Sequence, residues 1–448
     1  MEVVLASSSV DGGIGCWDLQ TGAEQLRYKS CSSPSHGLVS VGGRFLASSQ
    51  IRDPSASSGS VSKLYFWSWS KPQVEVRSFP AEPIMPLAAN HPGTYLAGGA
   101  SSGDIYFWQV ETGRLLKKWH AHYRAVTCLV FSEDDSLLIS GSEDGSVRVW
   151  SLIKIFDDLG SFEAKNLYLH SFTEHTLCVT DVVIGYGGCN AIIVSASEDR
   201  TCKVWSLATG TLLRNIVFPS IIDAIVLDPA EHIFYAGSRD GKIFIAALNT
   251  ERIPTNNYGM HIIGSFSNHS KAVTCLAYGA AGNLLISGSE DGMVRVWNAR
   301  TCNIIRMFKH AKGPVNNILV VKQEIDPSNH MSSTVEASSR KKGAYLSPPL
   351  EKYTNSADED SYIKVSLRGG ATDVKYLSSG MISKYAKELQ HQGSAAASEM
   401  EVEKLKHDCQ RSMQMANQFK KMYEDLIQFY VKELLDGGQA RTLDENGK

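Results

Sequence analysis

Three histidine–aspartate pairs are the side chains of this sequence best suited to proton transfer. They are His122 with Asp144, His175 with Asp199, and His269 with Asp291, separated by 22, 24 and 22 positions. A carboxylate beside an imidazole can orient the imidazole as a general base. However, an active site is needed once, whereas these pairs recur at a nearly constant spacing. The repetition favours a structural role over catalysis.

Two further motifs could also indicate chemistry. Residues 99–103 read GASSG, which matches the G-x-S-x-G pattern of a serine nucleophile. That pattern requires a strand followed by a helix, whereas the strand-like run DIYFW follows here. The triplet His120-Ala121-His122 has no further metal ligand nearby, and no phosphate-binding loop, dinucleotide fingerprint or zinc-protease motif occurs. We therefore expect no catalytic residue, no cofactor and no metal.

The elements that carry the pairs are sequence repeats. Residues 137–150 read LLISGSEDGSVRVW, and residues 284–297 differ from them only where Met293 replaces Ser146. A third copy, IIVSASEDRTCKVW, covers residues 192–205. Each copy predicts a strand, a tight turn and a second strand, because β-branched residues flank a turn-forming segment. A tryptophan follows the turn aspartate by six positions in four places: Asp11 and Trp17, Asp144 and Trp150, Asp199 and Trp205, Asp291 and Trp297.

These motifs resemble the WD-repeat family, in which each repeat contributes one four-stranded blade of a β-propeller. Seven units end at Trp17, Trp67, Trp108, Trp150, Trp205, Ala246 and Trp297. Ala246 marks a degenerate unit, and another follows a Ser-rich insertion at 52–63. The resemblance implies an all-β, seven-bladed propeller over residues 1–322. It also implies that the histidine, a serine or threonine, the aspartate and the tryptophan form a buried hydrogen-bonded network in each blade.

The first repeat lacks an innermost strand, because Met1 leads directly into VVLAS. The run PVNNILVVK at 314–322 has no partner of its own. We predict that residues 315–322 supply the innermost strand of the first blade. This pairing would close the ring and hide its sheet edges.

The chain after the ring changes in composition. Residues 323–377 are rich in Ser, Asp, Glu, Lys and Pro and predict a polar flexible linker. Residues 378–436 predict an α-helical, coiled-coil-like tail, because 399–435 contain no Gly or Pro. Residues 437–448 predict a disordered C-terminus. The proposed partner-binding face of the helix consists of Leu405, Cys409, Ala416, Phe419, Met422, Tyr423, Leu426 and Tyr430.

That apolar face has two interpretations. A propeller already has a complete core, so the face favours pairing of two copies or insertion into a partner. The alternative is that the helix packs back onto the ring.

Composition limits the class of protein. The chain has 448 residues, 43% of them hydrophobic, and a net charge of −3. It is therefore not basic overall, and we expect contact with nucleic acid to be indirect at most. No run approaches the ~20 apolar residues of a membrane helix, and the N-terminus MEVVLASSS lacks a signal peptide's basic region. The nine cysteines form no C-x-x-C pair, which indicates reduced thiols in an intracellular protein.

The whole chain resembles a narrower family, the WD-repeat subunits of the rixosome, which in plants includes the root-initiation-defective protein. The resemblance is carried by the start MEVVLASS, the degenerate second blade with YFWSW at 65–69, and the charged C-terminal helix. It implies a nuclear, nucleolar and nucleoplasmic scaffold that supports processing of the second internal transcribed spacer of pre-rRNA. The implied partners are the helical-repeat scaffold subunit, a midasin-type ATPase and the pre-60S particle.

Two other functions remain open at this stage. The first is a substrate receptor of a cullin-type ubiquitin ligase, because residues 297–300 read WNAR and come close to the docking motif Trp-Asp-x-Arg. The second is a cytoplasmic trafficking or signalling scaffold.

Overall fold

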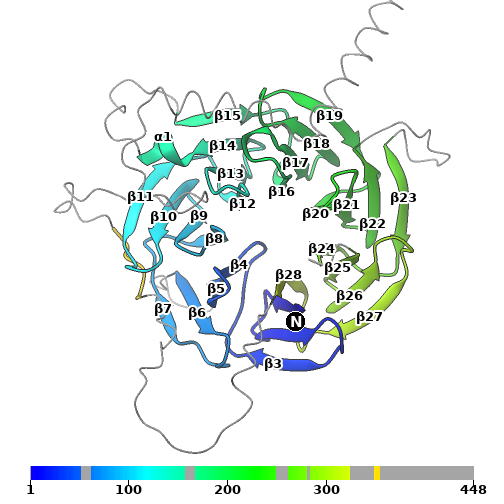
Figure 1. Ribbon diagram of the computed structural model, residues 1–448, viewed down its shortest axis with the longest axis horizontal. Coiled ribbons are helices and arrows are strands. Elements are labelled where there is room, and N and C mark those ends of the chain that lie inside the picture. The colour runs from blue at the N-terminus through cyan, green and yellow to red at the C-terminus, as the bar shows by residue number, and fades with distance from the viewer. Residues whose placement is uncertain are drawn as a thin grey trace, which may run out of the picture. The chain divides into compact units, whose positions relative to one another are not determined.

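Seven four-stranded sheets stand around a common axis in the computed structural model of this chain (Figure 1). The structure describes residues 2–51, 62–156, 167–248, 261–279, 283–322 and 348–353. Every pair of neighbouring strands within these sheets is antiparallel. The ring is thus an all-β, seven-bladed propeller.

The blades follow one another along the chain, with the innermost strand given first. Blade 1 contains β28 (Val315–Lys322), β1 (Glu2–Ser8), β2 (Ile14–Asp18) and β3 (Glu24–Tyr28). Blade 2 contains β4 (Leu38–Val41), β5 (Phe45–Gln50), β6 (Lys63–Ser68) and β7 (Val76–Ser78). Blade 3 contains β8 (Ile84–Ala89), β9 (Tyr95–Ala100), β10 (Asp104–Gln109) and β11 (Leu115–His120). Blade 4 contains β12 (Val126–Phe131), β13 (Leu137–Ser142), β14 (Val147–Ser151) and β15 (Tyr168–Phe172).

The remaining blades repeat the pattern. Blade 5 contains β16 (Val179–Ile184), β17 (Ile192–Ser197), β18 (Thr201–Ser206) and β19 (Leu212–Val217). Blade 6 contains β20 (Ile222–Leu227), β21 (Ile233–Ser238), β22 (Lys242–Ala247) and β23 (Ile262–Ser267). Blade 7 contains β24 (Val273–Tyr278), β25 (Leu284–Ser289), β26 (Met293–Asn298) and β27 (Ile304–Lys309). Two short helices, α1 (Leu152–Phe156) and η1 (Gly188–Asn190), lie in connections of blades 4 and 5.

Blade 1 is built from both ends of the ring. Strand β28 pairs antiparallel with β1 from Glu2 opposite Lys322 to Ser8 opposite Val315. Figure 1 shows β28 beside the N-terminus. This pairing joins segments about 310 residues apart, and the side chain of Asn317 extends it to the next blade. Its amide accepts from the backbone N–H of Gly37 and donates to the carbonyl oxygen of Pro34.

The core lies between successive blades, because each sheet covers the face of its neighbour. The innermost strands are also joined by threonine hydroxyls. Thr127 donates to the carbonyl oxygen of Val179 at 2.6 Å, and Thr180 donates to that of Ile222 at 2.7 Å. These bonds link blade 4 to blade 5 and blade 5 to blade 6 near the axis. Five tryptophans are the largest side chains that are fully buried: Trp67, Trp108, Trp150, Trp205 and Trp297.

A turn that enters blade 2 reaches toward the axis of the ring (Figure 1). His36 adopts a left-handed conformation, with φ of 57°. Its ring Nε2 lies 3.1 Å from the carbonyl oxygen of Thr180 in blade 5 and 3.7 Å from the carboxylate of Asp181. Burial raises the pKa of Asp181 above its usual range. The turn therefore connects two blades that are far apart around the ring.

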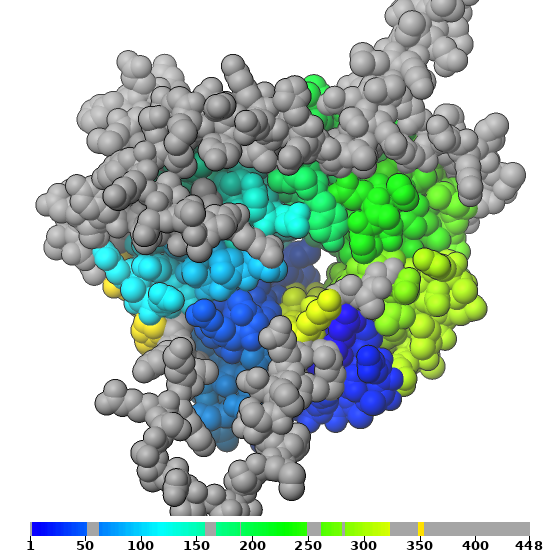
Figure 2. All heavy atoms as spheres, viewed as in Figure 1, coloured from blue at the N-terminus to red at the C-terminus, as the bar shows by residue number. Residues whose placement is uncertain are grey.

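Part of the segment assigned to the flexible linker packs against the ring. Residues 348–353 (gold in Figure 2) lie beside the cyan part of the chain at the edge of the propeller. Leu350 is only 5% exposed and belongs to the apolar cluster of blades 2 and 3. Strands of blades 2 and 3 thus hold Leu350 in an apolar cluster, and the assignment of residues 323–377 to a polar flexible linker stays a prediction.

Several predictions fall outside the described residues. They are the helical tail at 378–436 with its apolar face from Leu405 to Tyr430, the disordered end at 437–448, and the rest of the linker. Within the described part of the chain, no helix is long and apolar enough to cross a membrane.

Candidate functional site

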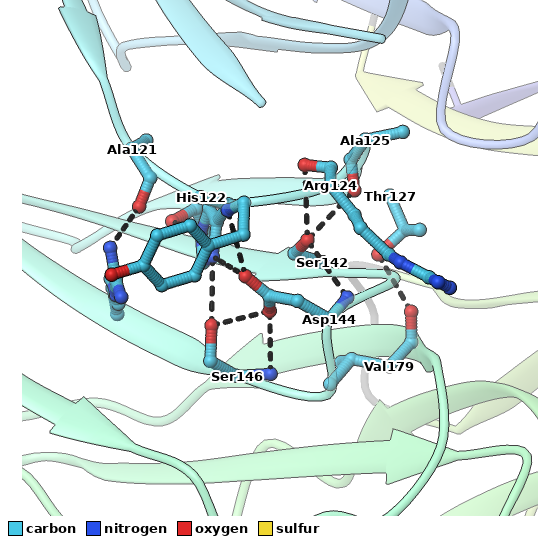
Figure 3. Close-up of polar contacts among 12 residues, drawn as sticks. Ala121, His122, Arg124, Ala125, Thr127, Ser142, Asp144, Ser146 and Val179 are labelled. Carbon is cyan, nitrogen blue, oxygen red and sulfur yellow. Dashed lines mark hydrogen bonds and ion pairs between the residues drawn. The ribbon is translucent and has the colours of Figure 1, made fainter. Parts of the chain in front are cut away.

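The histidine–aspartate pair of blade 4 belongs to a chain of four polar side chains. Figure 3 shows His122 and Asp144 of this chain, together with Ser146. The indole Nε1 of Trp150 donates to the hydroxyl of Ser140 at 2.9 Å, and Ser140 lies 2.6 Å from Nε2 of His122. Nδ1 of His122 lies 2.9 Å from the Ser146 hydroxyl and 3.4 Å from the Asp144 carboxylate. Asp144 also accepts from the backbone N–H of Ser146 at 2.9 Å. The turn, the inner strands and the tryptophan are thus joined in one network.

Blade 5 contains the same chain with shorter contacts to the carboxylate. Trp205 donates to Ser195 at 2.9 Å, and Ser195 lies 2.8 Å from Nε2 of His175. Nδ1 of His175 lies 2.9 Å from the carboxylate of Asp199. Asp199 also accepts from the hydroxyl of Thr201 at 2.6 Å.

Blade 7 repeats the chain with Trp297, Ser287, His269 and Asp291. The three successive contacts measure 2.8, 2.8 and 3.0 Å. Arg295 adds a hydrogen bond to the Asp291 carboxylate at 2.9 Å. Three of the seven blades therefore bring together the residues that the repeats predict.

The network selects one protonation state of each histidine. Burial lowers the pKa of His122, His175 and His269, although the neighbouring carboxylates act in the opposite direction. A neutral ring can accept the serine O–H at Nε2 and donate its Nδ1–H toward the aspartate. Burial by itself would raise the pKa of Asp291, but hydrogen bonds from Arg295, the Met293 amide and His269 bring it down to about 2. Each set therefore holds a neutral imidazole beside an ionised carboxylate.

The order serine, histidine, aspartate is also that of a hydrolytic triad. A triad needs a serine hydroxyl that can reach a substrate. Ser140 is fully buried, as are Ser195 and Ser287, and each hydroxyl already accepts a tryptophan N–H. The geometry of these three sets leaves no space for a substrate at the serine oxygen.

Blade 1 lacks this chain of bonds although it has Asp11 and Trp17. Ala6 stands where blades 4, 5 and 7 have serine, and Trp17 stacks on Phe308 with ring centroids 5.4 Å apart. His310 occupies the histidine position, but its ring contacts the carbonyl oxygens of Lys312 and Gly13 instead of Asp11. The loss of the serine hydroxyl removes the link between histidine and tryptophan.

Blade 6 replaces three of the polar members at once. Phe218 precedes β20 where blades 4, 5 and 7 have histidine, Ala236 replaces the serine, and Ala246 replaces the tryptophan. Phe218 is buried and packs against Phe244 with ring centroids 5.6 Å apart. A phenylalanine at the histidine position forms no hydrogen bond to a serine hydroxyl, and without that serine the indole N–H has no acceptor in the blade. The three replacements are therefore consistent with one another.

The serines are the residues that sequence reasoning did not name. Ser140, Ser195 and Ser287 each lie ten positions before the tryptophan of their repeat. That constant spacing within the aligned copies is the signal that could have identified them.

The other motifs considered in the sequence lie apart from any common site. GASSG forms the end of β9 and the turn into β10, so a strand follows the serines. His120 is exposed and contacts Asp104, whereas His122 is buried in the blade 4 network. Among the described residues, no cluster of three or more His, Cys, Asp or Glu side chains could hold a metal ion.

The family model described as "WD domain, G-beta repeat" matches residues 113–151, 166–206 and 260–298. Over 98% of its length, the chain is 55% identical to the whole of Protein ROOT INITIATION DEFECTIVE 3 of Arabidopsis thaliana. It is 33% identical to human WD repeat-containing protein 18 over 72% of this chain and 73% of that protein. It is 26% identical to the Schizosaccharomyces pombe Pre-rRNA-processing protein crb3/ipi3 over 70% of this chain and 77% of that protein.

Proposed function

The chain belongs to the WD-repeat family that includes Arabidopsis ROOT INITIATION DEFECTIVE 3 and human WD repeat-containing protein 18, and from this premise we propose that it is a scaffold subunit of a ribosome-assembly complex. The similarity to a protein named for pre-rRNA processing carries the proposal. In this role the chain supports processing of the internal transcribed spacer and maturation of the large subunit. It acts in the nucleus, both in the nucleolus and in the nucleoplasm.

The chain performs this role without catalysis. The histidine–aspartate sets stabilise individual blades, since their serines are buried and occupied by tryptophan N–H groups. The recurrence of one set in three blades supports the same assignment. The propeller then serves as a rigid frame whose loops and faces contact other proteins.

The proposed partners are proteins of the large-subunit precursor. They include a helical-repeat scaffold subunit, a midasin-type ATPase and the pre-60S particle itself. The proposed C-terminal helix, with Leu405, Phe419 and Leu426 on its apolar face, contributes to assembly and pairs two copies of the chain. Contact with RNA is indirect, because the net charge of the chain is −3.

The two other functions receive less support. A ligase receptor would need an acidic residue after Trp297, but Asn298 occupies that place, and its side chain accepts the backbone N–H groups of Arg300 and Thr301 at 3.0 Å. A trafficking scaffold has no counterpart among the relatives named above.

Affinity purification from nuclear extract tests the proposal. The tagged full-length chain is compared with a chain that ends at residue 353, which keeps the ring and the docked segment. We expect the full-length chain to recover large-subunit precursor proteins together with pre-rRNA that contains the second internal transcribed spacer. Depletion of the protein should increase the amount of that precursor RNA on a Northern blot.

Each outcome has a clear meaning. Loss of the helical-repeat subunit from the shorter chain would assign complex assembly to residues beyond 353. Recovery of a ubiquitin-ligase adaptor or vesicle-coat proteins, with unchanged precursor RNA after depletion, would contradict the proposed function.

A further inference from the structure

Blade 3 keeps its tryptophan but has lost the partners that this residue has in blades 4, 5 and 7. Gly98 stands at the serine position, Ser102 at the aspartate position and Pro80 at the histidine position. Trp108 is nevertheless fully buried. A buried N–H group without an acceptor is costly, so this indole needs an acceptor from outside its own blade.

The acceptor comes from a segment 243 positions away in the sequence. Nε1 of Trp108 donates to the carbonyl oxygen of Glu351 at 2.9 Å. The backbone N–H of Glu351 donates to the carbonyl oxygen of Gly113 at 2.8 Å. The backbone of the segment is thus bound at both its donor and its acceptor groups.

The side chains of the segment also have defined places. Leu350 is 5% exposed and packs in the cluster that contains Trp108, Val110 and Leu115 of blade 3 and Phe66 of blade 2. Its backbone N–H donates to the hydroxyl of Ser78 at 2.9 Å. A carboxylate oxygen of Glu351 lies 3.4 Å from the backbone N of Leu115.

The groove is shaped for close approach of a second backbone. Gly113 has φ of +72°, and a Cβ at this position would lie 2.7 Å from the carbonyl oxygen of Pro349. One wall is Ser78, which ends the outer strand of blade 2, and the other is the turn and outer strand of blade 3. Two successive prolines restrict the segment to extended conformations, which lowers the entropy lost on binding.

We infer that the groove lined by Ser78, Trp108, Gly113 and Leu115 is a peptide-binding site for an extended Pro-Pro-Leu-Glu segment, and that residues 348–353 of this chain are its ligand. Backbone hydrogen bonds provide affinity. The apolar cluster around Leu350 and the contact of the Glu351 carboxylate with the Leu115 N–H provide selectivity. The ligand completes blade 3 by satisfying Trp108. It also fixes the place at the rim, between blades 2 and 3, from which the chain continues toward its C-terminus.

Tethering allows this site to be filled by a weak ligand. Residues 323–347 connect the ring to the segment, and such a connection gives an effective concentration on the order of millimolar. A segment that binds in trans with a Kd of about 100 µM would therefore occupy the groove most of the time in cis. The inference is independent of the proposed role in ribosome assembly.

A peptide-binding experiment on the full chain tests the inference. Leu350→Asp empties the groove, because a carboxylate cannot occupy the apolar socket. A fluorescein-labelled peptide of residues 346–355 is titrated to 1 mM and followed by fluorescence anisotropy. We expect saturable binding to the Leu350→Asp chain and at least tenfold weaker binding to the wild type, whose groove is filled.

Matched controls keep the result interpretable. Tyr353→Ala changes an exposed residue of the same segment, 72% exposed, and should behave as the wild type. A peptide with Leu350→Asp should bind neither chain. Trypsin should cleave after Lys352 at least tenfold faster in the Leu350→Asp chain than in the Tyr353→Ala chain. Equal binding by all chains, no binding by Leu350→Asp, or equal cleavage rates would overturn the inference.

Discussion

Asn317 is the residue at which a single substitution tests how the ring is closed. It lies on β28, is 5% exposed, and its side chain bonds to groups of both blade 1 and the segment that enters blade 2. The contacts are Gly37 N at 3.1 Å, Ser7 Oγ at 3.1 Å, Ser33 Oγ at 3.3 Å and Pro34 O at 2.8 Å. Asn317→Ala removes all four.

The expected loss follows from these contacts. Each lost hydrogen bond costs about 0.5–1.5 kcal/mol, and the serine hydroxyls can turn to other acceptors, so the total is about 3 kcal/mol. The Gly37 N–H also retains a contact of 3.1 Å with the carbonyl oxygen of Pro34, which limits the loss. For a ring of this size, about 3 kcal/mol corresponds to a fall in Tm of about 4 °C.

Thermal unfolding followed by tryptophan fluorescence measures the effect. Asn316→Ala is the matched control, because it changes the same residue type on the same strand at a less buried position. We expect the control to melt within about 1 °C of the wild type. An Asn317→Ala chain that melts with the wild type, or a control that is equally destabilised, would refute the reasoning.

Three other perturbations test the ring and its networks. A chain that ends at residue 314 lacks β28 and leaves β1 unpaired on its inner edge. We expect this chain to show no cooperative thermal unfolding, and an unchanged Tm would contradict closure of the ring by β28. The free energy of unfolding should fall as the pH drops from about 7 to 5. Burial lowers the pKa of the histidines in the folded state below the unfolded value of about 6.5, so the unfolded chain binds more protons in this range. Urea midpoints across this range check the sign, and a flat profile would argue against neutral rings at His122, His175, His269 and His310. Asp199→Ala removes hydrogen bonds to His175, Thr176 and Thr201 and should lower the free energy of unfolding by about 2–4 kcal/mol in the same urea assay. Asp240→Ala is the control, because Asp240 lies in blade 6, which lacks the histidine; it should lower that free energy by less than about 1 kcal/mol.

The repeats made much of the fold predictable. A spacing of six positions between turn aspartate and tryptophan located most blades, because these two residues bracket a strand of constant length. The unpaired runs at the two ends of the ring led to the prediction that β28 completes blade 1. The same repeats located the histidine–aspartate pairs of blades 4, 5 and 7, since identical local sequences form identical turns.

Other features could not be read from the repeats. The chain of bonds fails in blade 1 because Ala6 replaces a serine that lies on a different strand from Asp11 and Trp17. His36 contacts Thr180 across 144 positions, and no local pattern of the sequence encodes that approach. The C-terminal helix remains a prediction from its heptad-like pattern alone.

The amino-acid sequence by itself determined the number of blades, the place of each turn and the residues available for each network. These properties depend on local strand and turn preferences, which repeat along the chain and need no knowledge of distant contacts. Only the tertiary structure decided which networks are complete and that residues 348–353 belong to the ring. Leu350 and the Glu351 carbonyl lie in a polar stretch of sequence. Leu350 is buried because it packs against side chains of blades 2 and 3, and the Glu351 carbonyl oxygen accepts the indole N–H of Trp108.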